Sequence, residues 1–164
     1  MPEVVTHRYD PVRGSGLNLC SLSDLEASRV LERMRRESRP SLKGDYLGRR
    51  RVTEAWLASA AREVLGRSFG APPVYFFLGD FSYLADSSRP ASLVIPLATL
   101  PADALTFTLG DSMSVAEEPG RRVYTLLEMI GLFARAEALA GFGFCDKDRI
   151  QKRFIEVQVW EWAG

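Results

Sequence analysis

Five segments of the chain are short and rich in β-branched, aromatic and other apolar residues, which is typical of β-strands. They are residues 4–9, 74–78, 91–97, 104–109 and 153–160. The runs at 74–78 and 91–97 are continuously apolar and predict strands buried on both faces. In 104–109, Leu and Phe alternate with Thr, which predicts a half-buried strand. Pro96 has no N–H group to donate, so we expect its end of the strand at a sheet edge or bulge.

Three further segments have apolar residues at helical spacing, at about 24–37, 46–65 and 126–139. Local signals for their ends are capping boxes at Ser23 with Glu26 and at Thr125 with Glu128, and a C-cap at Gly66. The residues expected to face the core are Leu25, Val30, Leu31 and Met34 in the first helix, Val52, Ala55, Trp56, Ala60 and Val64 in the second, and Leu127, Ile130, Phe133, Ala134 and Ala138 in the third.

The order of these elements is one strand, two helices, three strands, one helix and a last strand. Because helices and strands do not alternate regularly, the order favours an α+β fold over a doubly wound parallel sheet. We expect a mixed or antiparallel central sheet, interrupted along the chain by a two-helix insert, with a further helix before the C-terminal strand. A length of 164 residues is that of one domain, so residues 1–164 are predicted to form a single domain.

Charge is balanced overall, with 21 basic and 21 acidic residues, but it is unevenly distributed. Residues 29–51 include nine basic and three acidic residues, which gives this segment a net charge of +6. Such a segment is either a solvated helix surface or a contact for phosphates or nucleic acid, and the sequence leaves both open. Within it, Arg50 and Glu54 have the i, i+4 spacing of an ion pair on a helix surface.

The N-terminal residues lack the charged and apolar regions of a signal peptide, and no apolar run approaches the ~18–20 residues that span a bilayer. We therefore expect a cytoplasmic protein. Cys20 and Cys145 lie far apart and have no partner at metal-binding spacing, which predicts two free, mostly buried thiols.

Several chemistries are disfavoured by what the sequence contains. His7 is the one histidine, which argues against a histidine-based metal site. The stretch 66–70 matches G-x-S-x-G, but it follows a helix and precedes Pro72, whereas a nucleophile elbow lies between a strand and a helix. No P-loop motif occurs.

Glu156 stands out because it lies in the middle of an otherwise apolar strand. Phe154, Gln158 and Trp160 share its side of the strand, while Ile155 and Val157 lie on the other. A carboxylate in such surroundings is costly unless it is paired or functional, and burial raises its pKa toward values that suit acid–base work. The alternative is an edge strand on which Glu156 and Gln158 face water.

The segment Phe154-Ile155-Glu156-Val157-Gln158-Val159-Trp160 resembles the last core strand of the ADP-ribosyltransferase-like superfamily. Thr6-His7-Arg8-Tyr9, followed by a glycine-bearing loop, resembles the first strand of its members, and Val74-Tyr75-Phe76-Phe77 resembles the second core strand. The chain has neither a Ser-Thr-Ser motif nor a Glu-x-Glu pair. The resemblance identifies the chain as similar to small bacterial members of this superfamily.

The resemblance implies that NAD is the substrate and that Glu156 stabilises the oxocarbenium-like transition state. It implies that His7 or Arg8, with Tyr9, binds NAD, and that Tyr75 or Phe77 packs beside the nicotinamide. Gln158 is then expected to orient the acceptor, a protein or a nucleic acid. The basic segment 29–51, with Arg49 and Arg50, would hold phosphates of the cofactor or acceptor.

Two other hypotheses remain from the sequence alone. One is a non-catalytic binding or interaction module on the same α+β scaffold. The other is a nucleic-acid binder that uses residues 29–51 without chemistry. A cleft that brings Glu156 together with His7 or Arg8 favours the enzyme, whereas a flat, exposed strand favours the binding module.

Overall fold

The computed structural model describes residues 1–37, 40, 42–84, 86–143 and 153–163. Its strands are β1 (Val4–Tyr9), β2 (Val74–Leu78), β3 (Ala91–Pro96), β4 (Leu105–Thr108) and β5 (Glu156–Val159). Its α-helices are α1 (Asp24–Glu37), α2 (Tyr46–Leu65), α3 (Ser112–Val115) and α4 (Leu126–Phe133). Short 3-10 turns are η1 (Leu19–Ser21), η2 (Leu97–Thr99), η3 (Ala102–Ala104) and η4 (Ala136–Leu139).

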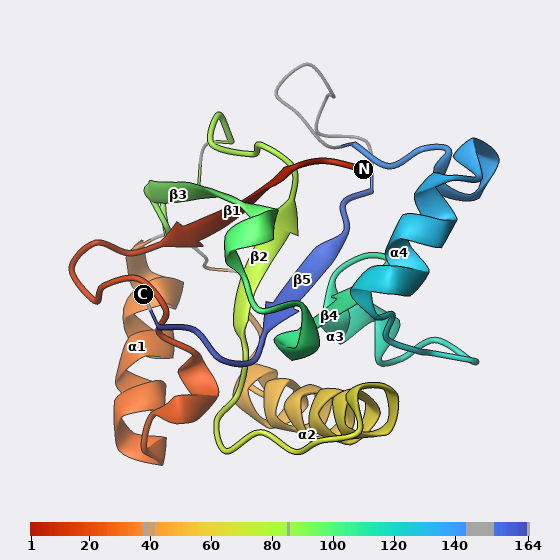
Figure 1. Cartoon of the computed structure of the whole chain (residues 1–164). Helices are drawn as coiled ribbons and strands as arrows, with labels where there is room; N and C mark the ends of the chain where they lie inside the picture. The colour runs from red at the N-terminus through yellow and green to blue at the C-terminus, as the bar shows by residue number, and fades with distance from the viewer. Residues whose placement is uncertain (38–39, 41, 85, 144–152, 164) are drawn as a thin grey trace.

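The five strands form one antiparallel sheet in the order β3-β1-β2-β5-β4 (Figure 1). The α+β class is therefore confirmed, as are the helical insert between β1 and β2 and the helix before the last strand. Thr125 and Glu128 form the expected capping box, Ser23 and Glu26 exchange the corresponding bonds, and Gly66 ends α2 with a positive φ. β5 lies between β2 and β4, so Glu156 is not on an edge strand.

The sheet opens between β1 and β2. β1 pairs with β3 along its whole length, but with β2 only through Val5–Leu78 and Thr6–Phe77. Beyond Thr6 the two strands no longer pair, and backbone groups of β2 need other partners. This opening is where the polar residues of β1 gather.

One face of the sheet is apolar and packs against α4, which lies at the right of the sheet in Figure 1. Its fully buried side chains come from every strand except the edge strand β3, and Met129 is the buried residue of α4. They include Val5, Phe76, Leu78, Leu105, Phe107, Ile155, Val157 and Val159. We call this side the apolar face.

The opposite face packs against α2, which crosses beneath the sheet in Figure 1. Its apolar part is small and consists of Leu57, Ala61, Ala104, Val123 and Trp160. Its buried polar residues include several from β4, β5 and α2: Thr106, Thr108, Glu156, Gln158, Thr53 and Glu54. We call this side the polar face.

In α1 the predicted core residue Leu31 is buried, whereas Leu25 is 61% exposed. The predicted core-facing sides of α2 and α4 were mostly wrong, although Trp56, Ala60 and Phe133 do pack against the core. In α2 the buried residues are Thr53, Glu54, Leu57 and Ala61, while Val52 is 68% exposed. In α4 Met129 is buried and Leu127 is 79% exposed, and the helix ends at Phe133 rather than 139. The apolar pattern misled because α2 turns polar side chains inward, toward polar partners on the sheet.

Two predictions about strand burial were also wrong. The threonines of β4 are buried as fully as its Leu and Phe, because they bond to β5 rather than to water. β3 is only partly buried, which fits its position at the sheet edge and confirms the expectation for Pro96. The stretch after Gly110 contains α3, whose N-cap is Asp111.

Cys20 is a free, half-buried thiol, and Cys145 lies outside the described residues. In the part of the chain that the structure describes, no helix has the length and apolarity needed to cross a membrane.

Candidate functional site

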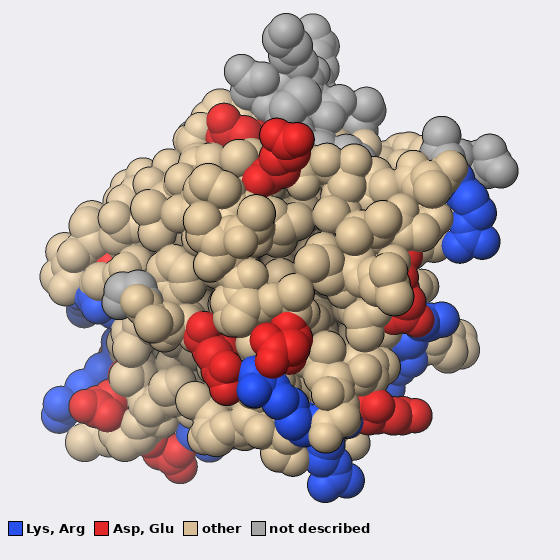
Figure 2. Space-filling view, viewed as in Figure 1, with Lys and Arg blue, Asp and Glu red and all other residues tan. Residues whose placement is uncertain are grey.

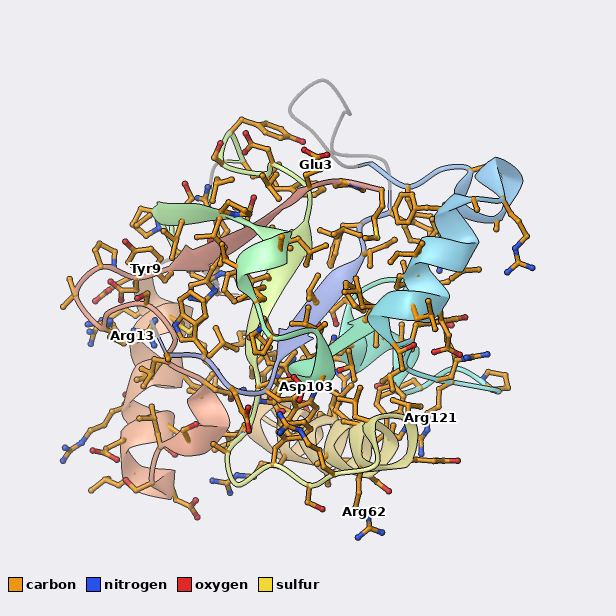
Figure 3. All side chains as sticks on the ribbon, in the orientation of Figure 1. Glu3, Tyr9, Arg13, Arg62, Asp103 and Arg121 are labelled. Carbon is orange, nitrogen blue, oxygen red and sulfur yellow. The ribbon has the colours of Figure 1, made fainter. Side chains whose placement is uncertain are left out.

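A cleft of about 210 Å³ lies where the sheet opens between β1 and β2. Its walls come from the end of β1, the loop that follows, the start of α2, β2 and β5. The lining includes His7, Arg8, Tyr9, Tyr75, Arg50 and Glu156. In Figure 3, Tyr9 and Arg13 mark the side of the cleft where β1 runs into its loop.

His7 fills the opening between the strands. Its Nδ1 lies 2.8 Å from the Tyr75 carbonyl, and its Nε2 accepts a hydrogen bond from the Gly16 N–H at 3.2 Å. Because Nε2 accepts, Nδ1 carries the proton and donates. Burial lowers the pKa of His7, with Arg89 adding to this effect and the Tyr75 bond opposing it, so the ring is neutral at pH 7. His7 thus joins β1, β2 and the loop over the cleft.

Arg8 is a buried cation, 5% exposed, that bonds to backbone oxygens. Its Nε and one Nη donate to the Arg89 carbonyl and its other Nη to the Ser82 carbonyl. The other arginines on the cleft wall have carboxylate partners: Arg13 with Asp10, Arg50 with Glu54 and Arg89 with Asp86. Among the described residues, Arg8 is the cleft arginine without an ion pair.

Glu156 is 7% exposed and lines the same cleft. Its Oε1 accepts hydrogen bonds from the Ser112 N–H at 3.3 Å and from Gln158 Nε2 at 3.1 Å. Burial raises the pKa of Glu156 to about 7; Asp111 adds to the rise, while Arg50 and the two hydrogen bonds oppose it. The carboxyl group of Glu156 therefore ionises near neutral pH.

Behind Glu156 a network of buried hydrogen bonds links β5 to β4. Gln158 donates to Thr108 Oγ1 at 3.1 Å and accepts from Thr106 Oγ1 at 3.0 Å. Trp160 Nε1 donates to Thr106 Oγ1 at 2.9 Å. Gln158 is fully buried and is not among the cleft-lining residues, so its contacts orient Glu156 rather than face a ligand.

Two residues of α2 contact Tyr75, one at its hydroxyl and one at its ring. Its hydroxyl donates to Glu54 Oε1 at 2.8 Å, and the Arg50 guanidinium lies 4.0 Å from the centroid of its ring. Burial raises the pKa of Tyr75 well above its ordinary value; Glu54 and Glu156 add to this effect and Arg50 opposes it. Tyr75 is therefore neutral.

The structure brings together in one cleft six of the nine residues singled out in the sequence: Glu156, His7, Arg8, Tyr9, Tyr75 and Arg50. Phe77 instead packs against the rings of Phe81 and Phe154. Arg49 forms an ion pair with Glu117 and does not line the cleft. Gln158 lies behind Glu156, as described above.

Two polar residues at the site were missed by sequence reasoning. The spacing predicts Glu54 as half of a surface ion pair, yet its side chain and that of Arg50 are only 9% and 11% exposed. Asn18, in the loop after β1, donates to Glu54 Oε1 and to the Pro73 carbonyl. One sequence signal could have identified Glu54: it lies on the same side of α2 as the apolar Leu57, one turn away. The apolar pattern had assigned that side to solvent.

The basic segment 29–51 is largely neutralised by nearby carboxylates. Arg33 pairs with Asp10, Arg36 with Glu37, Arg49 with Glu117 and Arg51 with Asp24. Figure 2 agrees: on the face it draws, most basic side chains lie beside acidic ones. Most of the arginines that the structure describes in this segment therefore have a carboxylate partner.

The cleft thus combines a carboxyl group that ionises near pH 7, a buried cation without a counter-ion and aromatic rings. Such a set suits a ligand with an anionic part and a flat ring that reacts through a positively charged transition state. Within the described residues, no group of three or more His, Cys, Asp and Glu residues is placed to bind a metal ion. No family model, curated protein or solved structure matches this chain.

Proposed function

We propose that the protein transfers ADP-ribose from NAD, or hydrolyses NAD, with Glu156 as the key carboxylate. The observation that carries this proposal is the convergence of His7, Tyr75 and Glu156 from distant parts of the chain on one cleft. These are the positions at which the sequence resembles ADP-ribosyltransferase-like proteins. The acceptor is water, a protein or a nucleic acid.

Cleavage of the bond between nicotinamide and ribose builds positive charge on the ribose. An ionised Glu156 beside that ribose stabilises the charge, and its effect is large because the carboxylate is buried where water screens little. The ring of Tyr75 offers a flat surface to the nicotinamide. Gln158 and the Ser112 N–H hold the carboxylate so that little reorganisation is needed.

Arg8 is the residue that we expect to bind the diphosphate of NAD. A guanidinium has five N–H groups, and three of those of Arg8 donate to carbonyl oxygens. A buried cation without a counter-ion is costly, and an anionic ligand relieves that cost. A phosphate of NAD is such a ligand.

The size of the cleft limits how NAD binds. A volume of about 210 Å³ is below the ~300–1,000 Å³ of typical ligand pockets. On this proposal the cleft accommodates one end of the dinucleotide, and the rest extends beyond it.

The test compares the parent with Glu156→Gln and with the matched control Glu117→Gln on the exposed surface. Calorimetric titration measures NAD affinity, and chromatography measures the nicotinamide released. We expect Glu156→Gln to lose about 10²–10³-fold in turnover with folding and NAD affinity preserved, as when one electrostatic stabiliser is removed. Equal turnover in the parent and in Glu156→Gln contradicts the proposal.

A non-catalytic binding module is the second candidate. Both ring nitrogens of His7 and the hydroxyl of Tyr75 are bonded to the protein itself, which favours a structural role for these groups. NAD that binds to the parent and to Glu156→Gln alike, without release of nicotinamide from either, favours this candidate. The ion pairs of segment 29–51 give little support to a nucleic-acid binder.

A further inference from the structure

Helix α2 places two charged side chains, one helical turn apart, against the polar face of the sheet. Arg50 Nε donates to Glu54 Oε1 at 3.1 Å, and both side chains are nearly buried. The same Glu54 oxygen also accepts from Tyr75 Oη at 2.8 Å and from Asn18 Nδ2 at 3.0 Å. One oxygen atom thus fixes a helix, a strand and a loop relative to one another.

Arg50 is occupied by contacts within the protein. Besides its bond to Glu54, its Nη1 lies 3.5 Å from Ser112 Oγ, at the long end of the hydrogen-bond range. Its guanidinium also covers the ring of Tyr75. A phosphate would have to displace these contacts, so they favour an internal role for Arg50 over the phosphate binding expected from the sequence.

The same residue reaches Glu156 through α3. Ser112 contacts Arg50 through its hydroxyl and donates its backbone N–H to Glu156 Oε1 at 3.3 Å. The charge of Arg50 opposes the effect of burial on the pKa of Glu156, and Arg50 is the largest opposing influence. A path of contacts therefore runs from Glu54 through Arg50 and Ser112 to Glu156.

We infer that Arg50 and Glu54 are positioning residues, which hold the Tyr75 ring and the Glu156 carboxylate in place from the helical insert. The inference rests on the proposed function only in its consequence for catalysis. Its structural part concerns the orientation and ionisation of two side chains, which are measured without NAD.

The ionisation of Glu156 is set by the groups that surround it. They are Arg50 from α2, Asp111 before α3, Tyr75 from β2, and elsewhere in the cleft lining His7, Arg8, Asp10, Arg13 and Arg89. Arg13 is paired with Asp10, and Arg89 with Asp86. His7 is neutral, Tyr75 is neutral, and Arg8 and Asp10 have carbonyl or arginine partners of their own. Arg50 is therefore the cation whose removal acts most directly on Glu156.

The test is a carbon-13 NMR titration of the Glu156 carboxyl group in the parent, in Arg50→Gln and in the control Arg49→Gln. Arg49 is the neighbouring arginine of α2, with an exposed partner and no place in the cleft lining. Loss of a nearby positive charge disfavours the carboxylate, so we expect Arg50→Gln to raise the pKa of Glu156 by about 1. We expect Arg49→Gln to leave it unchanged.

Arg50→Gln leaves Glu54 as a buried charge without its partner and for that reason can fail to fold. The double variant Arg50→Gln with Glu54→Gln removes both charges, so neither is left buried without its partner, and the pKa of Glu156 can be measured in it if the single variant does not fold. We expect the pKa of Glu156 to rise and the Tyr75 ring resonances to move. A Glu156 titration equal to that of the parent, or an equal rise in Arg49→Gln, overturns the inference.

The two proposals fail in different ways. If the parent releases no nicotinamide but Arg50→Gln shifts the Glu156 titration, the proposed function fails and the positioning role stands. If the parent is active and Arg50→Gln titrates like the parent, the positioning role fails alone. If both hold, the pH at which activity rises moves upward in Arg50→Gln together with the pKa of Glu156.

Discussion

The two faces of the central sheet are buried to a similar extent but by opposite means. The apolar face presents a continuous layer of Leu, Phe, Ile and Val to α4. The polar face presents threonines, a glutamine and a glutamate to α2, each with hydrogen-bond partners in the described structure. Apolar packing tolerates many side chains of similar volume, whereas a buried polar network is stable only when its members are satisfied together.

This difference matches the location of the candidate site. A buried carboxyl group or guanidinium costs stability, so its presence needs a reason that packing does not supply. Among the described residues, the side chains that form the apolar core are all uncharged, although the ring of His7 packs against one of them, Phe76. The polar face contributes Glu156, Tyr75 and Arg50 to the cleft.

Phe107→Ala breaks the apolar face and has the largest expected effect on stability. Phe107 is fully buried on β4, and removing its ring leaves a cavity between the sheet and α4. The free energy of unfolding should fall by about 3–5 kcal/mol, as for other buried Phe→Ala changes. Urea unfolding measures it, and Leu127→Ala on the exposed side of α4 is the control, with a change within about 0.5 kcal/mol. A small loss at Phe107 means that the face is not a packed core.

The elements that were predicted well are those with local signals at their ends. The bounds of β1, α1, α2 and β2 match the expected ranges, because capping residues and Pro or Gly mark their ends in the sequence. Glu156 stood out because it is polar within an apolar strand, and His7 because residues 6–9 resemble the first strand of a known superfamily. These signals need no knowledge of what packs against the element.

The residues that were misread depend on tertiary partners. Thr106 and Thr108 alternate with apolar residues, as in a half-solvated strand. In the structure both are buried and form hydrogen bonds with Gln158. Glu54 has the spacing of a surface pair, but Tyr75 and Asn18 also bond to it. A binary pattern assigns polar side chains to water and therefore cannot identify a polar interior, whose partners come from distant segments.

The pH dependence of stability tests the polar face separately from the apolar face, because Glu156 on the polar face ionises near pH 7. The pKa of Glu156 rises from its ordinary 4.5 to about 7 in the folded protein. Between these values the folded protein holds a proton that the unfolded chain has lost, so this group makes stability fall as the pH rises through the window. Above about pH 7 the full loss is present, about 3 kcal/mol at 1.36 kcal/mol per unit of pKa.

Glu156→Gln removes this contribution. The variant should be more stable than the parent by about 3 kcal/mol at pH 8, and the difference should shrink toward zero near pH 4. His7 acts in the opposite sense, because its lowered pKa costs stability below about pH 6.5, but both proteins contain it and the difference cancels its effect. Urea unfolding of both proteins at several pH values measures the difference. A difference that does not vary with pH means that the carboxyl group is solvated.

Thr106→Val tests whether the hydrogen bonds of the polar face hold it together. The hydroxyl of Thr106 donates to Gln158 Oε1 and accepts from Trp160 Nε1, and all three residues are buried. Valine has nearly the same shape but no hydroxyl, so it leaves a buried amide oxygen and an indole N–H without partners. The expected loss is about 1–3 kcal/mol in the free energy of unfolding. Thr106→Ser is the matched control, since it keeps the hydroxyl and removes a methyl group. If the Val variant is as stable as the parent while the Ser variant is weaker, this position is stabilised by packing, and the contrast between the two faces does not extend to it.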